Sequence, residues 1–347
     1  MEYKNLIINE NKTITEALLK LNIIRDISRL ILFVSSENGT IIGSLTDGDI
    51  RRSLAKEQNL LKKVGEICNR NYVFKEDTNG FIELQSFHKQ NIKILPLLNK
   101  EGALNRVIDL EKTQSLLPME AMIMAGGRGK RLSPLTDTVP KPMLILGDKP
   151  IIEHNIDRLI SFGIKKIYIS VNYLGKQIES YFGNGSSKGI QIEYIRENKS
   201  LGTAGSLSLV NEFKTDHILL INSDLFTNVN FEDMYLKLMD ENAQMVVAST
   251  EYKIDVPFAV FECENEKVQG FKEKPSYIYH SNAGVYMFKK ELVDMIPKNN
   301  YYNITDLMDK IIANEGKIFH DPIRGYWIDI GKPEDYIRAQ EFLKHLN

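Results

Sequence analysis

The chain has 347 residues, of which 43% are hydrophobic and 26% charged, and its formal net charge is −2. This composition predicts an ordinary globular protein of about two domains, and the near-neutral charge gives no sign of a nucleic-acid-binding surface. No apolar run approaches the ~18 residues of a membrane span, and the N-terminus lacks the pattern of a signal peptide. Cys68 and Cys263 are far apart and suit neither a disulfide framework nor a metal site, so we expect a cytoplasmic protein.

The first third of the chain contains two weakly similar copies of one pattern. In the first copy we expect a strand at 6–8, a helix at 14–24, strands at 29–35 and 40–46 joined by an Asn38-Gly39 turn, and a helix at 47–55. The second copy consists of the segments 64–78, 80–91 and 92–112, with Glu101-Gly102 at its hairpin turn. Two degenerate copies of roughly 58 residues predict a duplicated module that forms a separate domain.

Gly43, Thr46 and Asp49 in the first copy follow the spacing G-x-x-T-x-x-D. With this element the N-terminal domain resembles a tandem CBS-domain pair, with β-α-β-β-α repeats at about 1–60 and 61–117. In that family the threonine and the aspartate contact the phosphate and ribose of an adenine nucleotide, which implies a regulatory site at Thr46 and Asp49. The alternative is that these two residues only form the N-cap of the next helix, in a domain with a structural or oligomerising role.

Residues 122–143, MIMAGGRGKRLSPLTDTVPKPM, form a glycine-rich and basic loop directly after an apolar strand. Glycines let backbone N–H groups close on a ligand, and amides beside concentrated positive charge favour binding of a polyphosphate. The loop is not a Walker A motif, because Gly129-Lys130 is followed by Arg131. It is not a Rossmann fingerprint either, because Leu132 stands where the third glycine is required. The loop therefore predicts a site for a nucleoside triphosphate.

This stretch resembles, over about twenty residues, the signature (L/M)AGGxGxRLxPLTxxxPKPM of the sugar-1-phosphate nucleotidyltransferases, or NDP-sugar pyrophosphorylases. The resemblance implies transfer of a nucleoside monophosphate to a sugar 1-phosphate, with release of pyrophosphate. It places Ala125, Gly126 and Gly127 at the nucleotide. Arg131 over the triphosphate and Lys141 near the α-phosphate are the expected catalytic residues.

The remainder, 119–347, alternates helix and strand and is expected to fold as one nucleotidyltransferase domain. Expected helices lie at 151–163, 176–183 and 203–213, and expected strands at 165–173, 191–197 and 217–224. Short apolar strands separated by helices indicate strands buried on both faces, hence a Rossmann-like open α/β sheet of the mixed kind. Its binding site should lie at the carboxyl ends of the strands, where the glycine loop also begins.

The segment Leu201 to Gly205, LGTAG, resembles the base-binding element of the same family, with Gly202 and Thr203 at the nucleotide. Uridylyl and thymidylyl members carry glutamine five residues before the first of these glycines, whereas this chain has Glu197. An ionised carboxylate offers only acceptors, which suits the adjacent N–H donors of guanine and predicts GTP as the donor. A Glu197 that faces solvent would leave uridylyl or thymidylyl transfer open.

Two aspartates are the expected Mg2+ ligands. Asp224 ends an apolar strand, and Asp329 follows an aromatic one in the sequence WIDIGKPEDY. One or two carboxylates together with substrate phosphates suffice for Mg2+. Their pairing as the two metal-binding positions is implied by the resemblance, while the alternative for Asp329 is a helix cap.

The resemblance also places a sugar-phosphate site in two later segments. Glu273 and Lys274 match the family's FxEKP motif, in which glutamate accepts sugar hydroxyls and lysine holds the phosphate. Asn282 and Gly284 match its NAG(I/V)Y strand, in which asparagine contacts the sugar. The alternatives are an exposed charge pair in a hairpin and a turn residue.

Taken together, the sequence predicts a homo-oligomeric enzyme that transfers GMP from GTP to glucosamine 1-phosphate or mannose 1-phosphate. The combination with a CBS pair resembles enzymes of bacterial surface glycan or nonulosonate biosynthesis. A non-catalytic regulatory subunit that senses sugar nucleotides is the alternative. Such subunits usually lose a basic loop residue or a metal aspartate, and this chain has them all.

Overall fold

The computed structural model of the chain describes residues 3–24, 27–78 and 81–346. The chain divides into two compact units, residues 1–116 and 117–347, each with apolar clusters of its own. None of the helices within the described ranges is both long and apolar enough to cross a membrane.

The first half of the N-terminal unit is a three-stranded sheet with two helices. Its elements are η1 (Tyr3–Leu6), β1 (Ile7–Asn9), α1 (Ile14–Ile23), β2 (Ile31–Ser35), β3 (Ile41–Thr46) and α2 (Asp47–Lys56). β1 pairs parallel with β2, and β2 pairs antiparallel with β3 through a turn in which Gly39 has φ +84°. Thr13 and Glu16 form a capping box at the start of α1. The predicted strands and helices of this half begin within a few residues of their expected positions.

The second half repeats this arrangement in a shorter form. Its elements are η2 (Val64–Glu66), β4 (Lys75–Glu76), α3 (Gln85–Lys89), β5 (Ile94–Leu98) and β6 (Leu104–Asp109). β4 pairs parallel with β5, and β5 pairs antiparallel with β6 around Gly102, which has φ +77°. The segment 80–91 yields only the short helix α3, and Gly80 lies outside the described residues. The internal similarity of the sequence therefore corresponds to a repeated β-α-β-β arrangement.

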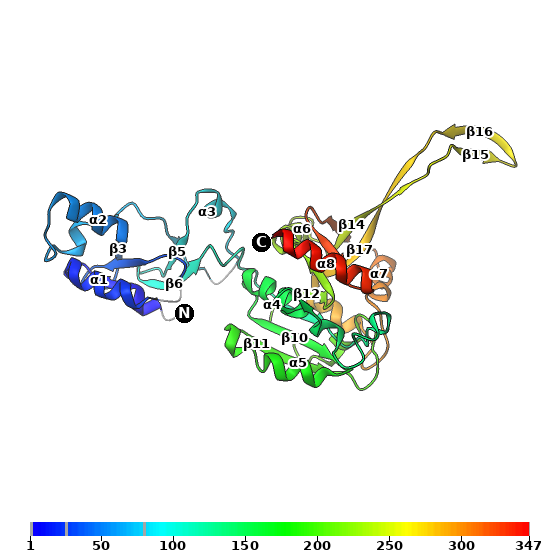
Figure 1. Ribbon diagram of the computed structural model, residues 1–347, viewed down its shortest axis with the longest axis horizontal. Helices are drawn as coiled ribbons and strands as arrows, with labels where there is room; N and C mark the ends of the chain where they lie inside the picture. Colours follow the sequence, from blue (N-terminus) through cyan, green and yellow to red (C-terminus); the bar gives the residue numbers. More distant parts are fainter. Residues whose placement is uncertain (1–2, 25–26, 79–80, 347) are drawn as a thin grey trace. The chain divides into compact units, whose positions relative to one another are not determined.

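The C-terminal unit is built on a mixed sheet, shown in Figure 1 with α4 and α5 beside it. Within the described residues the strand order is β11-β10-β7-β12-β17-β14-β18. These strands are β7 (Glu120–Met124), β10 (Lys166–Val171), β11 (Gln191–Arg196), β12 (His217–Asn222), β14 (Met245–Asp255), β17 (Ser276–Lys289) and β18 (Ile318–Pro322). The first four are mutually parallel, whereas β17 is antiparallel to both of its neighbours. The expected α/β sheet is thus present, and it is mixed.

Helices, single turns and two-stranded pairs complete the unit. The helices are α4 (Ile151–Ser161), α5 (Gly175–Phe182), α6 (Phe231–Asp240), α7 (Ile304–Ala313) and α8 (Pro333–Leu346). The 3-10 turns are η3 (Lys130–Leu132), η4 (Lys141–Met143), η5 (Ser186–Lys188), η6 (Gly205–Leu209) and η7 (Lys290–Met295). The pairs are β8 (Ile145–Leu146) with β9 (Lys149–Pro150), β13 (Leu225–Thr227) with β19 (Trp327–Asp329), and β15 (Val260–Glu264) with β16 (Lys267–Lys272).

The helix expected at 203–213 is wrong, because only the 3-10 turn η6 forms there. Backbone N–H groups of Ala204 and Gly205 both donate to the carbonyl oxygen of Tyr302. A Cβ on Gly205 would lie 2.5 Å from the carbonyl oxygen of Asn300. The segment packs closely against Asn300 and Tyr302, about a hundred residues later in the sequence. This tertiary packing overrides the local helical pattern.

Strands β14 and β17 are longer than their neighbours and continue beyond the sheet. They pair with each other as far as Asp255 and Ser276, whereas β18 pairs with β14 only up to Ser249. β15 and β16 then form a hairpin at the far end (Figure 1). We call residues 251–281 the arm.

Candidate active site

A cleft of about 410 Å³ lies at the carboxyl ends of β7 and β12. This is the edge of a parallel sheet where α/β proteins place their ligands. The residues that line the cleft are Met124, Gly126, Gly127, Gly129, Lys130, Arg131, Lys141, Pro142, Glu197, Ser200, Gly202, Thr203, Asn222, Ser223, Asp224, Tyr301 and Asn303.

The glycine loop turns directly out of β7 into the cleft. Ala125 is buried and donates its N–H to the carbonyl oxygen of Ser170, so it anchors the loop and does not line the cleft. Gly129 has φ +67°, and a Cβ there would lie 2.9 Å from Cβ of Lys141. Gly127 faces open space. Glycine is therefore required at Gly129 by packing and backbone conformation, whereas Gly127 leaves its backbone accessible to a ligand.

Three charged side chains, Arg131, Lys141 and Asp224, line the cleft, and a fourth, Asp329, lies close to them without lining it. Lys141, on η4, is buried and donates a hydrogen bond to Oδ2 of Asp224. Asp224 precedes β13, which pairs with β19 so that Leu225 lies opposite Asp329, and Ile330 donates its N–H to the carbonyl oxygen of Asp224 at 3.0 Å. The Arg131 guanidinium is 3.6 Å from where a Cβ on Gly331 would stand, two residues after Asp329.

Asp329 is held in an environment that disfavours its charge. Its Oδ1 atom is buried and has no hydrogen-bond partner among the described residues. Burial raises the pKa of the Asp329 carboxyl, the neighbouring Asp224 raises it further, and Lys141 and Arg131 partly oppose these effects. A buried polar oxygen without a partner is rare in folded proteins, and an ordered water or a bound cation would satisfy it.

The two aspartates fit a divalent cation. A cation between them would satisfy the orphaned oxygen and remove the repulsion between the carboxylates. In the described part of the chain, no group of three or more His, Cys, Asp or Glu side chains could hold a metal. A cation here would thus depend on the two aspartates plus substrate phosphates and water, which is the coordination that Mg2+ favours.

Glu197 and two residues of the LGTAG loop, Gly202 and Thr203, also line the cleft. Glu197 is buried, and its carboxylate accepts hydrogen bonds from the Ser170 hydroxyl and from the Leu201 N–H. A Cβ on Gly126 would come within 3.0 Å of its Oε1. Glu197 therefore lies at the cleft and not in solvent, held in place by two donors with acceptor capacity remaining.

Tyr301 and Asn303 also line the cleft, and no motif in the sequence predicts either of them. The segment that contains them packs against the LGTAG loop. The Tyr302 carbonyl oxygen accepts hydrogen bonds from the N–H groups of Ala204 and Gly205. Thr203 Oγ1 accepts a hydrogen bond from the Ile304 N–H at 2.9 Å. Gly202 has φ +77°, and a Cβ there would lie 2.7 Å from the Tyr302 carbonyl oxygen. No local pattern identifies these residues, because their position depends on a contact made across a hundred residues of chain. Asn222 ends β12, and Ser223 follows it directly before Asp224, so their place at the end of a buried strand is a signal in the sequence.

The expected sugar-phosphate residues fall into two groups. Gly284 has φ +74°, and a Cβ there would lie 2.5 Å from Nδ2 of Asn222, which lines the cleft. Asn282 accepts the Gly284 N–H at 2.9 Å. Asn282 and Gly284 are thus beside the cleft. Glu273 and Lys274 are not, because they lie on the arm, exposed, between β16 and β17.

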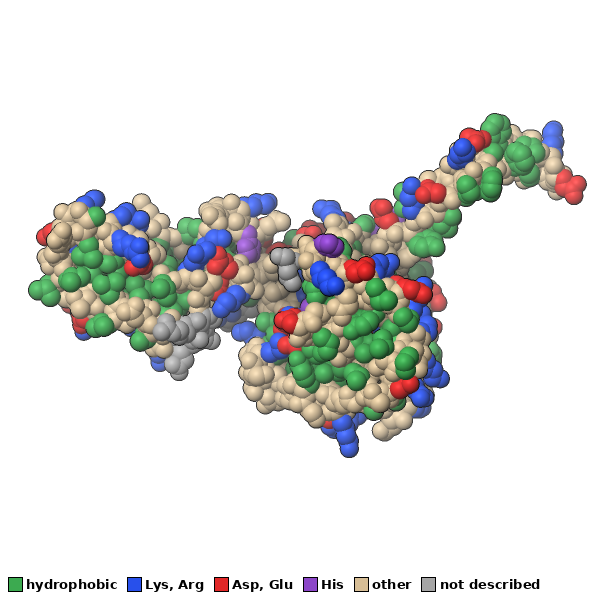
Figure 2. All heavy atoms as spheres, viewed as in Figure 1, with side chains coloured by type: hydrophobic (Ala, Val, Ile, Leu, Met, Phe, Trp, Pro, Cys, Tyr) green, Lys and Arg blue, Asp and Glu red, His purple; other side chains and the backbone are tan. Residues whose placement is uncertain are grey.

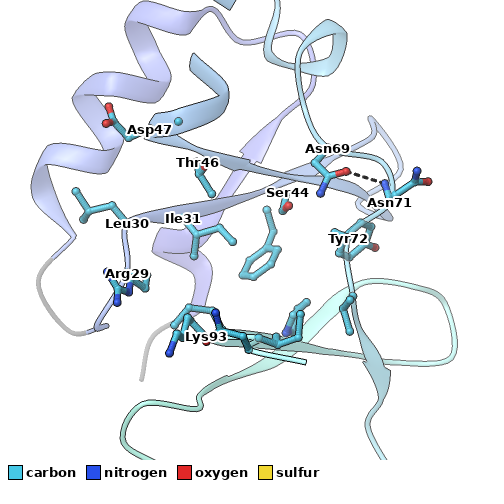
Figure 3. A pocket seen from close by; sticks show the side chains of 17 residues that line it. Arg29, Leu30, Ile31, Ser44, Thr46, Asp47, Asn69, Asn71, Tyr72 and Lys93 are labelled. Carbon is cyan, nitrogen blue, oxygen red and sulfur yellow. Dashed lines mark hydrogen bonds between the residues drawn. The ribbon is translucent and has the colours of Figure 1, made fainter. Parts of the chain in front are cut away.

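The N-terminal unit contains a second cavity of about 540 Å³ (Figure 3). Thr46, Asp47 and Gly48, at the start of α2, line it together with Arg29 and Lys93. Asp49 does not line it: its carboxylate accepts from the Thr46 N–H and hydroxyl and from Arg52. Thr46 and Asp49 form a capping box for α2, which is the N-cap alternative stated above.

Known proteins share both the fold and the sequence pattern of the C-terminal unit. The structure of HddC from Yersinia pseudotuberculosis complexed with GMP-PN superimposes with a TM-score of 0.51 at 22% identity, over 65% of this chain and 99% of that one. The unit therefore has the mixed α/β fold of that protein. The sequence matches the Nucleotidyl transferase family over residues 120–345, and the chain belongs to this family.

Curated relatives of the chain act on different nucleotides and sugars. The mannose-1-phosphate guanyltransferase beta-B of Xenopus laevis is 32% identical over 227 residues, which are 63% of this chain and 63% of the relative. A UTP–glucose-1-phosphate uridylyltransferase of Synechocystis is 31% identical over 242 residues, 64% of this chain and 62% of the relative. The chain therefore spans less than two thirds of the length of these relatives.

Proposed function

We propose that this protein transfers a nucleoside monophosphate from a nucleoside triphosphate to a sugar 1-phosphate. The observation that carries the proposal is a cleft lined by Arg131, Lys141, Asp224 and the glycine loop, with Asp329 close to Asp224. Attack of one phosphate on another requires neutralisation of charge, and these residues supply two cations and a site for a third. Membership of the Nucleotidyl transferase family supports the same reaction.

In the proposed reaction the sugar phosphate needs no general base. Its second pKa is near ~6, so the attacking oxygen is already ionised at neutral pH. That oxygen forms a bond to the α-phosphorus of the nucleotide while the bond to the bridging oxygen breaks, and pyrophosphate leaves. Arg131 and Lys141 stabilise the charge on the phosphates, and the exposed backbone at Gly127 orients them. A Mg2+ ion bound by Asp224 and Asp329 would supply further neutralisation.

We further propose that the donor is GTP. Glu197 supports this preference because a fixed, buried carboxylate at the cleft presents acceptors to the adjacent N1–H and N2–H2 donors of guanine. Several relatives are mannose-1-phosphate guanylyltransferases, and one similar structure is complexed with GMP-PN. A uridylyltransferase among the relatives makes UTP the rival donor.

A panel of nucleoside triphosphates against sugar 1-phosphates, read by pyrophosphate release and product mass, tests both proposals. We expect the highest kcat/KM with GTP, and mannose 1-phosphate and glucosamine 1-phosphate as acceptors. Glu197→Gln should fold, because an amide can still accept from Leu201 and donate to Ser170, and it should reduce the preference for GTP over UTP. A protein that releases no pyrophosphate with any pair would contradict the reaction, whereas a preference for UTP would contradict only the base assignment.

For the N-terminal unit we propose a CBS-type pair that binds an adenine nucleotide in its cavity. The support is the first turn of α2 at Asp47 and Gly48, where the helix dipole favours a phosphate, and the nearby cations Arg29 and Lys93. Both cations also contact Glu111, so the ligand would compete with that carboxylate. Calorimetric titration with AMP and with adenosine tests this: AMP should bind and adenosine bind more weakly, and Arg29→Ala should weaken AMP only.

A further inference from the structure

The arm exposes many large apolar side chains. Phe258, Phe261 and Phe271 are exposed by 74%, 62% and 64%, and Tyr252, Ile278 and Tyr279 by more than half. Figure 2 shows hydrophobic side chains along its length. Isolated exposed apolar residues are normal on a protein surface, but a row of them on one narrow element marks an interaction surface.

Strand pairing gathers these side chains in cross-strand pairs. Phe261 lies opposite Phe271 in the β15–β16 ladder, and Tyr252 lies opposite Tyr279 in the β14–β17 ladder. Side chains directly opposite each other in antiparallel strands lie on the same face of the ribbon. The arm therefore presents paired aromatic side chains that can pack together against a partner.

The backbone of the arm also lacks cover. In the arm, the described residues of β14 after Ser249 and of β17 before Asn282 pair only with each other. Both outer edges of this ribbon are therefore unpaired. A two-stranded ribbon is at best marginally stable in water, and open edges readily pair with another chain. The long extension of β14 and β17 is thus a structure that needs a partner.

We propose that the arm is the interface between two copies of this chain. Five aromatic side chains, each of about 150–250 Å² and exposed by 55–74%, offer roughly 500–800 Å² per copy. A stable interface buries about 800 Å² per partner, so two arms packed together approach this size without any other surface. A two-fold contact uses the same patch on both copies, which a ribbon with apolar side chains and two free edges allows.

The charges of the arm favour a second copy over a membrane or a nucleic acid. Residues 251–281 contain six acidic and four basic side chains. Lys272 pairs with Glu262 and Lys253 with Asp255, so the basic groups form no cluster that attracts anionic lipid or phosphate. A second arm brings the same mixture of signs, and an antiparallel approach can place acidic groups opposite basic ones.

Sedimentation velocity of the full chain, from about 1 to 100 µM, tests the proposal. We expect the wild-type protein to dimerise and the double variant Phe261→Asp, Phe271→Asp to be monomeric with an unchanged circular dichroism spectrum. Leu61→Asp, at a side chain 76% exposed in the N-terminal unit, should remain dimeric. Should the double variant misfold, Tyr252→Ser with Tyr279→Ser decides in its place. A monomeric wild type, or a dimer that survives the arm variants, would overturn the proposal.

Cys263 provides an independent measurement, because it is exposed on β15. In a Cys68→Ser background its rate of reaction with a thiol reagent should fall at least severalfold as the protein concentration passes through the dimer dissociation constant. The Phe261→Asp, Phe271→Asp variant should react quickly at every concentration. Slow reaction of Cys263 in a protein that sediments as a monomer would place the arm against its own chain and overturn the proposal.

Discussion

Asp329 combines a cost in stability with the proposed role in metal binding. Its raised pKa, caused by burial and by Asp224, means that the folded state binds a proton more tightly than the unfolded state. Below the unfolded-state pKa, Asp329 is protonated in both states and does not lower the free energy of unfolding. As the pH rises through the folded-state pKa, this favourable condition is lost and the protein becomes less stable. Above the folded-state pKa the ionised carboxylate destabilises the metal-free protein.

We therefore predict that Asp329→Asn raises Tm at pH 7 in the presence of a chelator. The gain should shrink as the pH falls towards the ordinary aspartate pKa of about 3.9, because wild-type Asp329 then becomes neutral as well. Added Mg2+ should raise Tm of the wild-type protein and leave that of the variant unchanged, because binding stabilises only a protein that has the site. Thermal melts over a pH series measure both effects, with Asp240→Asn, an exposed aspartate on α6, as the control. A variant that melts below wild type at pH 7 would refute this reading of Asp329.

Replacing Arg131 distinguishes an effect of its charge on catalysis from an effect on stability. Arg131 is exposed in the loop that follows β7, beside Gly331 and close enough to Asp329 to lower its pKa. We predict that Arg131→Ala lowers kcat by about 10²–10³-fold, the effect of removing one group that stabilises transition-state charge. Tm should change little, because the side chain is solvated. Arg338→Ala, which removes an exposed arginine of α8, should keep wild-type turnover, and a wild-type rate in Arg131→Ala would remove this residue from the site.

At the scale of elements, the LGTAG loop depends on a close backbone contact with the segment before α7. Gly202 and Gly189 both have a left-handed φ, of +77° and +70°, but a Cβ on Gly202 would meet the Tyr302 carbonyl oxygen, whereas nothing lies within 4 Å at Gly189. The two positions therefore separate backbone conformation from packing.

We predict that Gly189→Ala costs about 1–2 kcal/mol, the price of a left-handed alanine, and leaves KM for the nucleotide unchanged. Gly202→Ala should lose about 1–3 kcal/mol more from overpacking and should also raise that KM, because the loop must move away from Tyr302. Urea denaturation and initial-rate kinetics on both variants measure the difference. Equal losses in the two variants would mean that the contact between the loop and Tyr302 carries no energy.

The sequence predicts those features that are determined by residues close to them along the chain. The glycine loop after an apolar strand, Asp224 at the end of another strand, and Gly39 and Gly102 at hairpin turns are each where their neighbours in sequence indicate. The cleft itself depends on contacts between distant segments, so Tyr301 and Asn303 carry no local signal. The helix expected at 203–213 fails for the same reason, since Gly205 packs against Asn300. The length of the arm cannot be predicted from the sequence either, because the residue pattern of a strand does not indicate where the neighbouring strands of its sheet end.

At the scale of the whole molecule, the chain divides its proposed tasks between two units. The N-terminal unit buries its own apolar cluster around Phe33 and Leu45, and its cavity is lined by residues of that unit alone. The C-terminal unit buries clusters around Phe288 and Ile330 and contains every residue of the proposed nucleotidyl transfer site. Units with cores of this kind are expected to fold separately.

We therefore predict that a chain of residues 117–347 folds alone and retains nucleotidyl transfer. Its first residue still anchors the unit, because Leu117 donates its N–H to the carbonyl oxygen of Phe162. With GTP and its best sugar phosphate, kcat/KM should stay within about threefold of the full chain, a difference of ~0.6 kcal/mol. Any change in rate caused by AMP in the full chain should be absent from the truncated one. Thermal melting and pyrophosphate release measure these outcomes side by side. A truncated chain that folds but turns over a hundredfold more slowly would show that the N-terminal unit completes the active site and does not merely regulate it.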